Sequence, residues 1–163
     1  MKTPGDEGCR ICRVDATHVA DLINIGRETN LSPWSAASYL DEIKNPSSVM
    51  LRLVSDENET VGFVVGRLVI GGTIETSYDA EIYNIAVASG HQGNGFGQIL
   101  LGSFLAEVTA LGARNVWLEV RESNKKAIDL YRRNGFENVQ TRPNFYDEPR
   151  EAALLMRLQI LGK

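Results

Sequence analysis

The sequence has few residues of the kinds that form disulfides and metal sites. It contains two cysteines, Cys9 and Cys12, and two histidines, His18 and His91. A C-x-x-C spacing occurs in redox pairs and in half of a zinc site, but zinc needs two further ligands. The same residues also fit a first strand, with the two thiols on opposite faces. We interpret Cys9 and Cys12 as strand residues and predict no bound metal.

A long hydrophobic run and an excess of cations are also missing. The longest apolar stretch, residues 61–74, is interrupted by several glycines and Arg67, so it is too broken to span a bilayer. Residues 1–8 lack the apolar segment of a secretory signal. Lys and Arg number 17 against 21 Asp and Glu, a net charge of −4, which disfavours nucleic-acid binding and favours basic partners. We predict a cytoplasmic protein that binds neither nucleic acid nor a membrane.

What is present is typical of one globular domain. The chain has 163 residues, of which 43% are hydrophobic and 23% are charged. That is enough chain and enough apolar surface for one core without a disulfide or metal. We predict a flexible tail over residues 1–8 and a single domain over residues 9–163. No pattern in the sequence predicts an oligomeric state.

Hydrophobic periodicity predicts an α/β fold. Period-two and β-branched runs predict strands at residues 10–14, 48–54, 60–70, 79–87, 115–121, 136–142 and 152–158. Three helices are expected after N-caps at Thr17, at Ser32 or Ser35, and at Ser123. Another helix is expected to begin at Phe96, directly after a glycine-rich loop. The apolar faces of the second and third helices are predicted to include Leu40 and Leu111. Three consecutive strands favour antiparallel pairing, and the β-α-β segment around Gly95 favours one parallel crossover.

The loop between the fourth strand and the third helix fits a phosphate. It reads Gln92-Gly93-Asn94-Gly95-Phe96-Gly97. Free N–H groups at a helix N-terminus attract an anion, and glycines let the backbone approach it closely. The motif is neither a Walker loop nor the dinucleotide fingerprint. Glycines alone would equally suit a flexible connection.

The surroundings of this loop make the motif more specific. Gln92-x-x-Gly95-x-Gly97 resembles the Q/R-x-x-G-x-G/A motif of the GNAT superfamily of acetyl-CoA-dependent N-acetyltransferases. The resemblance extends to Ile85-Ala86-Val87 before the loop and to Asn124 and Leu130–Phe136 after it. It implies the GNAT fold, a mixed and mostly antiparallel sheet of about seven strands flanked by about four helices. The one parallel crossover would lie at the cofactor site.

The resemblance also implies residue roles. Backbone amides of Gly93, Asn94, Gly95, Phe96, Gly97 and Gln98 would bind the pyrophosphate of acetyl-CoA, and Gln92 at the start of the motif would also be a cofactor-binding residue. Ile85, Ala86 and Val87 would pair with the pantetheine arm and polarise the thioester, and Asn124 would contact the cofactor. Glu119 would be the general base and Tyr131 the general acid for direct attack by an amine through a tetrahedral intermediate. No metal is implied.

A closer likeness is to the bacterial ribosomal-protein alanine N-acetyltransferases. It rests on four segments: Pro33-Trp34-Ser35, Ala80–Val87, Trp117–Asn124 and Arg142–Tyr146. Trp34 and Tyr146 are the candidate substrate-binding residues in these segments. Two departures matter: the pyrophosphate loop has no Arg or Lys, and the predicted loop Asp147–Glu151 differs from the Gly-His-Glu-Asp-Ala type of those relatives.

Each candidate also has a structural interpretation. Glu119 alternates with Trp117 and Arg121 on one strand face, where it could simply pair with an arginine. Tyr131 could be a packed aromatic, Asn124 could extend a helix cap, and Trp34 could anchor a small core. A positioned carboxylate and phenol, by contrast, supply the proton transfers of acetyl transfer, each worth about 10²–10⁴-fold. The cofactor motif favours the catalytic interpretation.

The acceptor amine can be ranked by its basicity. At pH 7.5 an α-amine, with a pKa of about 7.7–8.0, costs only tenths of a kcal/mol to deprotonate, and a lysine about 4 kcal/mol. We therefore predict an N-terminal acceptor, for which ribosomal protein S18 is a candidate, and the acidic surface suits such a basic partner. The alternatives are a small-molecule amine, a protein lysine, and a non-catalytic acyl-CoA-binding regulatory module.

Overall fold

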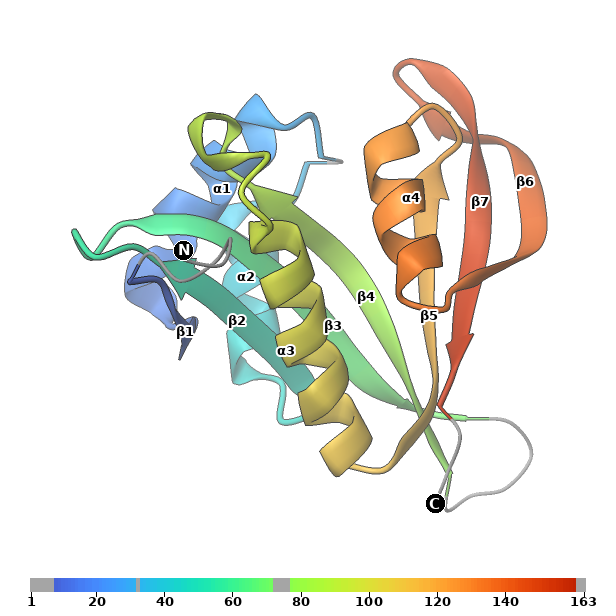
Figure 1. The fold of residues 1–163 in the computed structure, drawn as a ribbon, viewed down its shortest axis with the longest axis horizontal. Coiled ribbons are helices and arrows are strands. Elements are labelled where there is room, and N and C mark those ends of the chain that lie inside the picture. Colours follow the sequence, from blue (N-terminus) through green and yellow to red (C-terminus); the bar gives the residue numbers. More distant parts are fainter. Residues whose placement is uncertain (1–7, 32, 72–76, 161–163) are drawn as a thin grey trace, which may run out of the picture. The chain divides into compact units, whose positions relative to one another are not determined.

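The computed structural model describes residues 8–31, 33–71 and 77–160. Figure 1 shows the elements coloured in chain order. They are β1 (Arg10–Arg13), the 3-10 helix η1 (Ala16–His18), α1 (Val19–Glu28), α2 (Ala36–Lys44), β2 (Ser48–Val54), β3 (Thr60–Ile70), β4 (Tyr78–Val87), the 3-10 helix η2 (Ser89–His91), α3 (Phe96–Ala110), β5 (Ala113–Arg121), α4 (Lys125–Arg133), β6 (Glu137–Asp147) and β7 (Arg150–Gln159). The predicted order of strands and α-helices is confirmed. The predicted tail lies almost wholly outside the described residues.

The strands form one seven-stranded sheet in the order β1-β2-β3-β4-β5-β7-β6. Antiparallel pairs join β1 to β2, β2 to β3, β5 to β7 and β7 to β6. Strands β4 and β5 pair in parallel, from Tyr78–Ala113 to Ile82–Leu118, and α3 makes the crossover between them. Parallel neighbours need a long connection, which the 15 residues of α3 provide. The mixed sheet with one parallel crossover is confirmed.

The chain forms two compact units. The first unit takes in Met1–Arg67 and Asn84–Glu107, and the second takes in Leu68–Tyr83 and Val108–Lys163. The core of the first unit contains the inward positions of α1, as its periodicity predicts, together with residues of β2, β3 and β4. Its buried members are Val14, Val19, Leu22, Ile25, Tyr39, Met50, Phe63, Val65 and Ala86.

Two predicted helix caps are wrong by one or two residues. Asp15, not Thr17, caps the first helical turn, because its carboxylate accepts a hydrogen bond from the Thr17 N–H at 2.8 Å. The Thr17 hydroxyl donates to the same carboxylate and is the main cause of a lowered pKa at Asp15, and the N–H bond lowers that pKa further. Asn124, not Ser123, caps α4 through its Oδ1, which accepts from the Ala127 N–H at 3.2 Å. Asp and Asn are at least as good N-caps as Ser and Thr, so residue type did not separate the neighbouring candidates.

The cap of α2 is confirmed for one of its two candidates. The Ser35 hydroxyl accepts from the Ser38 N–H at 3.1 Å, and Ser32 lies outside the described residues.

The predicted apolar faces of α2 and α3 are partly wrong. Leu40 is 37% exposed, and Leu111 is 50% exposed and follows the end of α3. In α2 the buried positions are Tyr39 and Glu42, three residues apart, so a charged side chain turns inward where Leu40 was expected.

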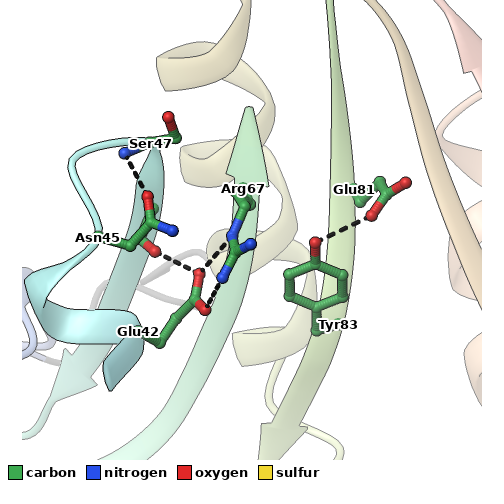
Figure 2. Close-up of polar contacts among 7 residues, drawn as sticks. Glu42, Asn45, Ser47, Arg67, Glu81 and Tyr83 are labelled. Atoms are coloured by element: carbon green, nitrogen blue, oxygen red, sulfur yellow. Dashed lines mark hydrogen bonds and ion pairs between the residues drawn. The ribbon is translucent and has the colours of Figure 1, made fainter. Parts of the chain in front are cut away.

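Glu42 is buried as half of an ion pair, which Figure 2 shows. Arg67 of β3 donates to its carboxylate from Nε at 3.1 Å and from a terminal nitrogen at 2.5 Å. The Ser48 hydroxyl, at the start of β2, donates to the same carboxylate. The Glu42 side chain is 5% exposed and that of Arg67 is 35% exposed. This cluster ties α2 to two strands of the first unit.

Replacing Glu42 by alanine should lower the free energy of unfolding by about 3 kcal/mol, at the low end for breaking a buried pair. Arg67 and Ser48 would lose their shared acceptor, and the partial exposure of Arg67 limits the loss. Urea denaturation measures the effect. Glu57→Ala, in the exposed turn between β2 and β3, should stay within about 0.5 kcal/mol of wild type. A loss below about 1 kcal/mol for Glu42→Ala would contradict the structural role.

The end of the β6–β7 hairpin also differs from expectation. Tyr146 pairs with Glu151 and Asp147 pairs with Arg150, so Glu148 and Pro149 alone make the turn. The predicted five-residue loop Asp147–Glu151 is therefore wrong. Both strands extend further than their hydrophobic pattern because backbone pairing continues through polar residues, and β6 is largely exposed along its length.

Candidate active site

The predicted cofactor loop follows β4 in the first unit. Gly93 and Gly95 have φ of +83° and +79°, the left-handed region that only glycine enters without strain. A Cβ built on either glycine would meet no atom within 4 Å. The loop backbone therefore borders open space at both positions.

Side chains of the loop hold its shape. Gln92 donates from Nε2 to the carbonyl of Val87 at 3.0 Å, and Asn94 donates from Nδ2 to the carbonyl of His91 at 3.2 Å. Just before the loop, the Ser89 N–H donates to the Glu28 carboxylate at 2.8 Å, which ties the loop to the end of α1. The loop conformation is thus set by the chain itself.

The start of α3 fits an anion. Phe96 is buried and anchors the first turn, and the Ile99 N–H donates to the Gly95 carbonyl at 3.2 Å. The N–H groups of the turn before that bond have no carbonyl within the helix to receive them, and the helix dipole makes this end positive. Gly97 and Gln98 belong to this first turn. Backbone amides beside open space fit the pyrophosphate of acetyl-CoA without a basic side chain.

The three β4 residues assigned to the cofactor arm have different environments. Ala86 is buried in the core of the first unit, and Ile85 and Val87 are partly exposed. The carbonyl of Val87 is used by Gln92. The alternation places Ile85 and Val87 on the face opposite Ala86.

Glu119 lies on β5 in the second unit. Val116, Leu118 and Val120 are buried, and Trp117, Glu119 and Arg121 are partly exposed on the other face, which confirms the predicted alternation. Glu119 Oε1 accepts a hydrogen bond from Arg142 of β6 at 3.0 Å. The side chains are 27% and 42% exposed, so this ion pair is in contact with solvent. The expected pairing of Glu119 with an arginine is therefore present.

Tyr146 of the second unit interacts with Glu119, and Tyr131 interacts with Tyr146. Tyr131 of α4 is buried, and its ring centroid lies 5.7 Å from that of Phe136. Burial raises the pKa of Tyr131, and Tyr146 raises it further. The pKa of Tyr146 is raised mainly by burial and then by the negative charge of Glu119. Glu119, Tyr146 and Tyr131 thus form a connected group, and both phenols stay protonated at neutral pH.

Two residues that the sequence did not single out organise this group. The Arg121 guanidinium lies 4.1 Å from the ring centroid of Tyr146, a cation–π contact. Glu151 accepts from the Ser123 N–H at 2.5 Å and from Arg121 at 3.4 Å. The side-chain hydrogen bond of Ser123 is the main cause of a lowered pKa at Glu151, and the Ser123 N–H bond is the second. Alternation along β5 could have pointed to Arg121, but only the hairpin register brings Glu151 to it.

The remaining candidates are Asn124 and Trp34. Asn124 is the N-cap of α4 in the second unit, so the expected cap role is present, and the cap uses its carbonyl oxygen. Trp34 packs against the core of the first unit, with its ring centroid 5.2 Å from that of Tyr39. The structure brings together Glu119, Tyr131 and Tyr146 in one unit, and the glycine loop, Ile85–Val87 and Trp34 belong to the other.

Other kinds of site are not seen in the part of the chain that the structure describes. Cys12 lies in β1, as the strand interpretation predicts, whereas Cys9 comes directly before that strand. Over residues 8–31, 33–71 and 77–160, no three side chains of the metal-binding types come together. Among the same residues, no helix has the length and apolar character needed to cross a bilayer.

Comparison with known proteins gives the family context. Residues 19–136 match the acetyltransferase (GNAT) family. The chain is 33% identical over 149 residues to the [ribosomal protein bS18]-alanine N-acetyltransferase of Haemophilus influenzae, covering 90% of this chain and 95% of that one. The crystal structure of the ribosomal-protein-S18-alanine N-acetyltransferase from Escherichia coli is similar with a TM-score of 0.81 and 27% identity, covering 95% of this chain and 97% of that one.

A plant structure shares the fold. Arabidopsis thaliana NAA60 in complex with acetyl-CoA has a TM-score of 0.82 and 18% identity, covering 93% of this chain and 99% of that one. The fold is therefore one on which acetyl-CoA is bound in a solved neighbour.

Proposed function

Because the chain belongs to the acetyltransferase (GNAT) family and is an acetyltransferase, we propose that it transfers the acetyl group of acetyl-CoA to the N-terminal α-amine of a protein. The observation that carries the proposal is the group formed by Glu119, Tyr146 and Tyr131 in the second unit. A solvent-touching carboxylate beside phenols that stay protonated supplies a proton acceptor and a proton donor at neutral pH. Ribosomal protein S18 is the specific acceptor that we propose, since relatives named as N-acetyltransferases of this ribosomal protein match the chain over most of its length.

The cofactor residues follow from the first unit. The amides of Gly93–Gln98 would hold the pyrophosphate, and Ile85–Val87 would lie along the pantetheine arm. Acetyl-CoA supplies the activated acetyl group when bound. The loop fits it because its two left-handed glycines border open space at a helix N-terminus.

Glu119 would accept the proton of the attacking amine. Its ion pair with Arg142 is partly solvated, and such pairs are worth only about 0–1 kcal/mol. The α-ammonium group of an acceptor can therefore replace Arg142 as the partner of Glu119 with little loss of free energy. Because an α-amine is half neutral near pH 8, a single carboxylate suffices as its base, whereas deprotonating a lysine amine costs about 4 kcal/mol at pH 7.5.

The acetylation of defined acceptors tests the function directly. Purified protein would be mixed with acetyl-CoA and one acceptor, and release of free thiol would be followed. We expect activity on a peptide carrying the N-terminus of S18 and little on the same peptide with only a lysine amine free. Activity only on polyamines or on lysine peptides would contradict the acceptor. Binding of acetyl-CoA without thiol release on any amine would indicate a regulatory module instead.

Glu119→Gln should reduce kcat/KM on an N-terminal peptide most strongly near pH 6.5–7, and the defect should shrink above the amine's pKa of about 8. Below that pH the amine is charged and needs the base, and above it the amine is mostly neutral. The measurement is the pH profile of kcat/KM for both proteins. Glu122→Gln, at an exposed neighbouring carboxylate, is the matched control and should follow wild type. Coinciding profiles for Glu119→Gln and wild type would remove Glu119 from the mechanism.

A further inference from the structure

Tyr146, a candidate substrate-binding residue, lies just beyond an irregular stretch of the β6–β7 ladder in the second unit. Arg142 pairs with Ala153, and the next pair is Tyr146 with Glu151, so β6 advances further than β7 between them. In this stretch Asn144 has a φ of +56°, in the left-handed region. Only the pairs of Tyr146 and of its neighbour follow before the turn. Such a short two-stranded end is marginally stable, so the place of Tyr146 depends on side-chain contacts.

Arg121 of β5 supplies contacts that hold this end of the hairpin. Its guanidinium lies 4.1 Å from the centroid of the Tyr146 ring. Its terminal nitrogens donate to two carbonyls of the turn, that of Pro149 at 3.2 Å and that of Glu148 at 3.3 Å. The Arg121 side chain is 21% exposed, so these contacts are partly shielded from water. One side chain thus contacts both the Tyr146 ring and the turn beyond it.

Glu151 of β7 holds Arg121 in this position. Its carboxylate accepts from Arg121 at 3.4 Å and from the Ser123 N–H at 2.5 Å, and its side chain is 13% exposed. The planar fork of a guanidinium serves a ring, carbonyls and a carboxylate together, which a lysine ammonium does not. Glu119, the proposed base, lies two residues before Arg121 on the same face of β5. Arg121 therefore connects the face of the proposed base to the Tyr146 ring.

We propose that Arg121 is a positioning residue that acts through Tyr146 in binding the acceptor peptide. This rests on the proposed function and assigns to the β6–β7 hairpin the part of the acceptor beyond the amine. Both terminal nitrogens of Arg121 are bonded within the hairpin, so it supports the ring and does not itself bind the acceptor. Its loss should weaken acceptor binding and spare the glycine loop, which belongs to the first unit.

The KM for an N-terminal peptide gives the first test. Arg121→Met removes the charge and the donors from a side chain of similar length, so KM should rise about 10-fold, while kcat changes less than about twofold. Arg121→Lys keeps a cation without the planar fork, so its KM should lie between these values. Arg157→Met is the matched control: Arg157 lies 5.6 Å from the centroid of the Trp117 ring, a contact of the same kind, and its loss should leave KM unchanged. All three variants should bind acetyl-CoA like wild type.

A double-mutant cycle with Tyr146 gives the second test. Tyr146→Ala alone should raise KM for the peptide about 10-fold. If Arg121 acts through the ring, adding Arg121→Met to Tyr146→Ala should raise KM by less than about twofold further, because the two residues then contribute as one unit. A role that does not involve Tyr146 would give the same rise in both backgrounds. Arg121→Gln replaces Arg121→Met in the cycle if the methionine variant does not fold.

Several results would overturn the assignment while wild type stays active and the proposed function stands. An unchanged KM in Arg121→Met or in Tyr146→Ala, or an equal rise in Arg157→Met, would remove the contact from acceptor binding. Equal rises with and without the Tyr146 ring would show that Arg121 acts by another route, and lost acetyl-CoA affinity would assign its role to cofactor binding. Failure of wild type on every N-terminal peptide would overturn the proposed function and this inference with it.

Discussion

Tyr131→Phe should lower kcat about 100-fold or more while acetyl-CoA affinity stays near wild type, if the hydroxyl donates the proton to the departing sulfur. The substitution keeps the ring, which packs against Phe136, and removes only the hydroxyl. Burial raises the pKa of Tyr131, so the hydroxyl remains a donor throughout the neutral range. Steady-state kinetics on an N-terminal peptide, with acetyl-CoA binding by calorimetry, separates the chemical step from cofactor binding.

The pH dependence gives a second readout for Tyr131. An acid must be protonated to act, so activity would be lost as pH rises through its pKa. Because burial raises that pKa above the ordinary value of about 10, wild type should show no loss from this group below pH 10. Tyr78→Phe, at an exposed tyrosine of β4, is the control and should leave kcat unchanged. A fall of less than about threefold in Tyr131→Phe would make the hydroxyl structural.

Gly95→Val should weaken acetyl-CoA binding about 100-fold or more, because a β-branched side chain would fill the open space beside the loop amides. Hydrogen bonds to charged groups are worth about 1.5–3 kcal/mol each, and the loss of two exceeds the 2.7 kcal/mol that 100-fold requires. The left-handed φ of +79° adds backbone strain for valine. Calorimetry or thermal-shift titration with acetyl-CoA measures the change.

Strain and ligand exclusion can be told apart with a second glycine. Gly112, just after α3, has a φ of +95° and equally open surroundings, but it lies outside the loop. Gly112→Val should lose a similar amount of stability, about 1–2 kcal/mol from backbone strain, and keep its acetyl-CoA affinity. Equal affinities for wild type and a folded Gly95→Val protein would show that the loop does not bind the pyrophosphate.

The order of elements could be predicted from the sequence because it depends on local patterns. β-branched runs and helical spacing of apolar residues are read within a few neighbours, and β2 and β3 begin and end where expected. The glycine loop was also predictable, since its positive φ angles and its place before α3 are local properties. The alternation of β5, which sets Glu119 apart from Val116, Leu118 and Val120, is of the same kind.

Details that depend on competition between neighbours were not predictable. Asp15 and Asn124 cap helices where Thr17 and Ser123 were expected, because adjacent polar residues have nearly equal capping strength. Glu42 is buried in place of Leu40, because Arg67, which is distant in the sequence, neutralises it and Ser48 adds a hydrogen bond. The sequence alone contains no sign that these three residues meet.

The sequence by itself determined the fold class, the glycine loop at the helix start, and the carboxylate and phenol that are candidates for proton transfer, since each is a local pattern or a family motif. Only the tertiary structure decided what surrounds them. Strand β7 pairs with both β5 and β6, and these two registers bring Arg142 to Glu119 and Glu151 to Arg121. Hydrogen bonds and charge pairs between residues far apart in the chain follow from strand register and packing, which no local pattern encodes.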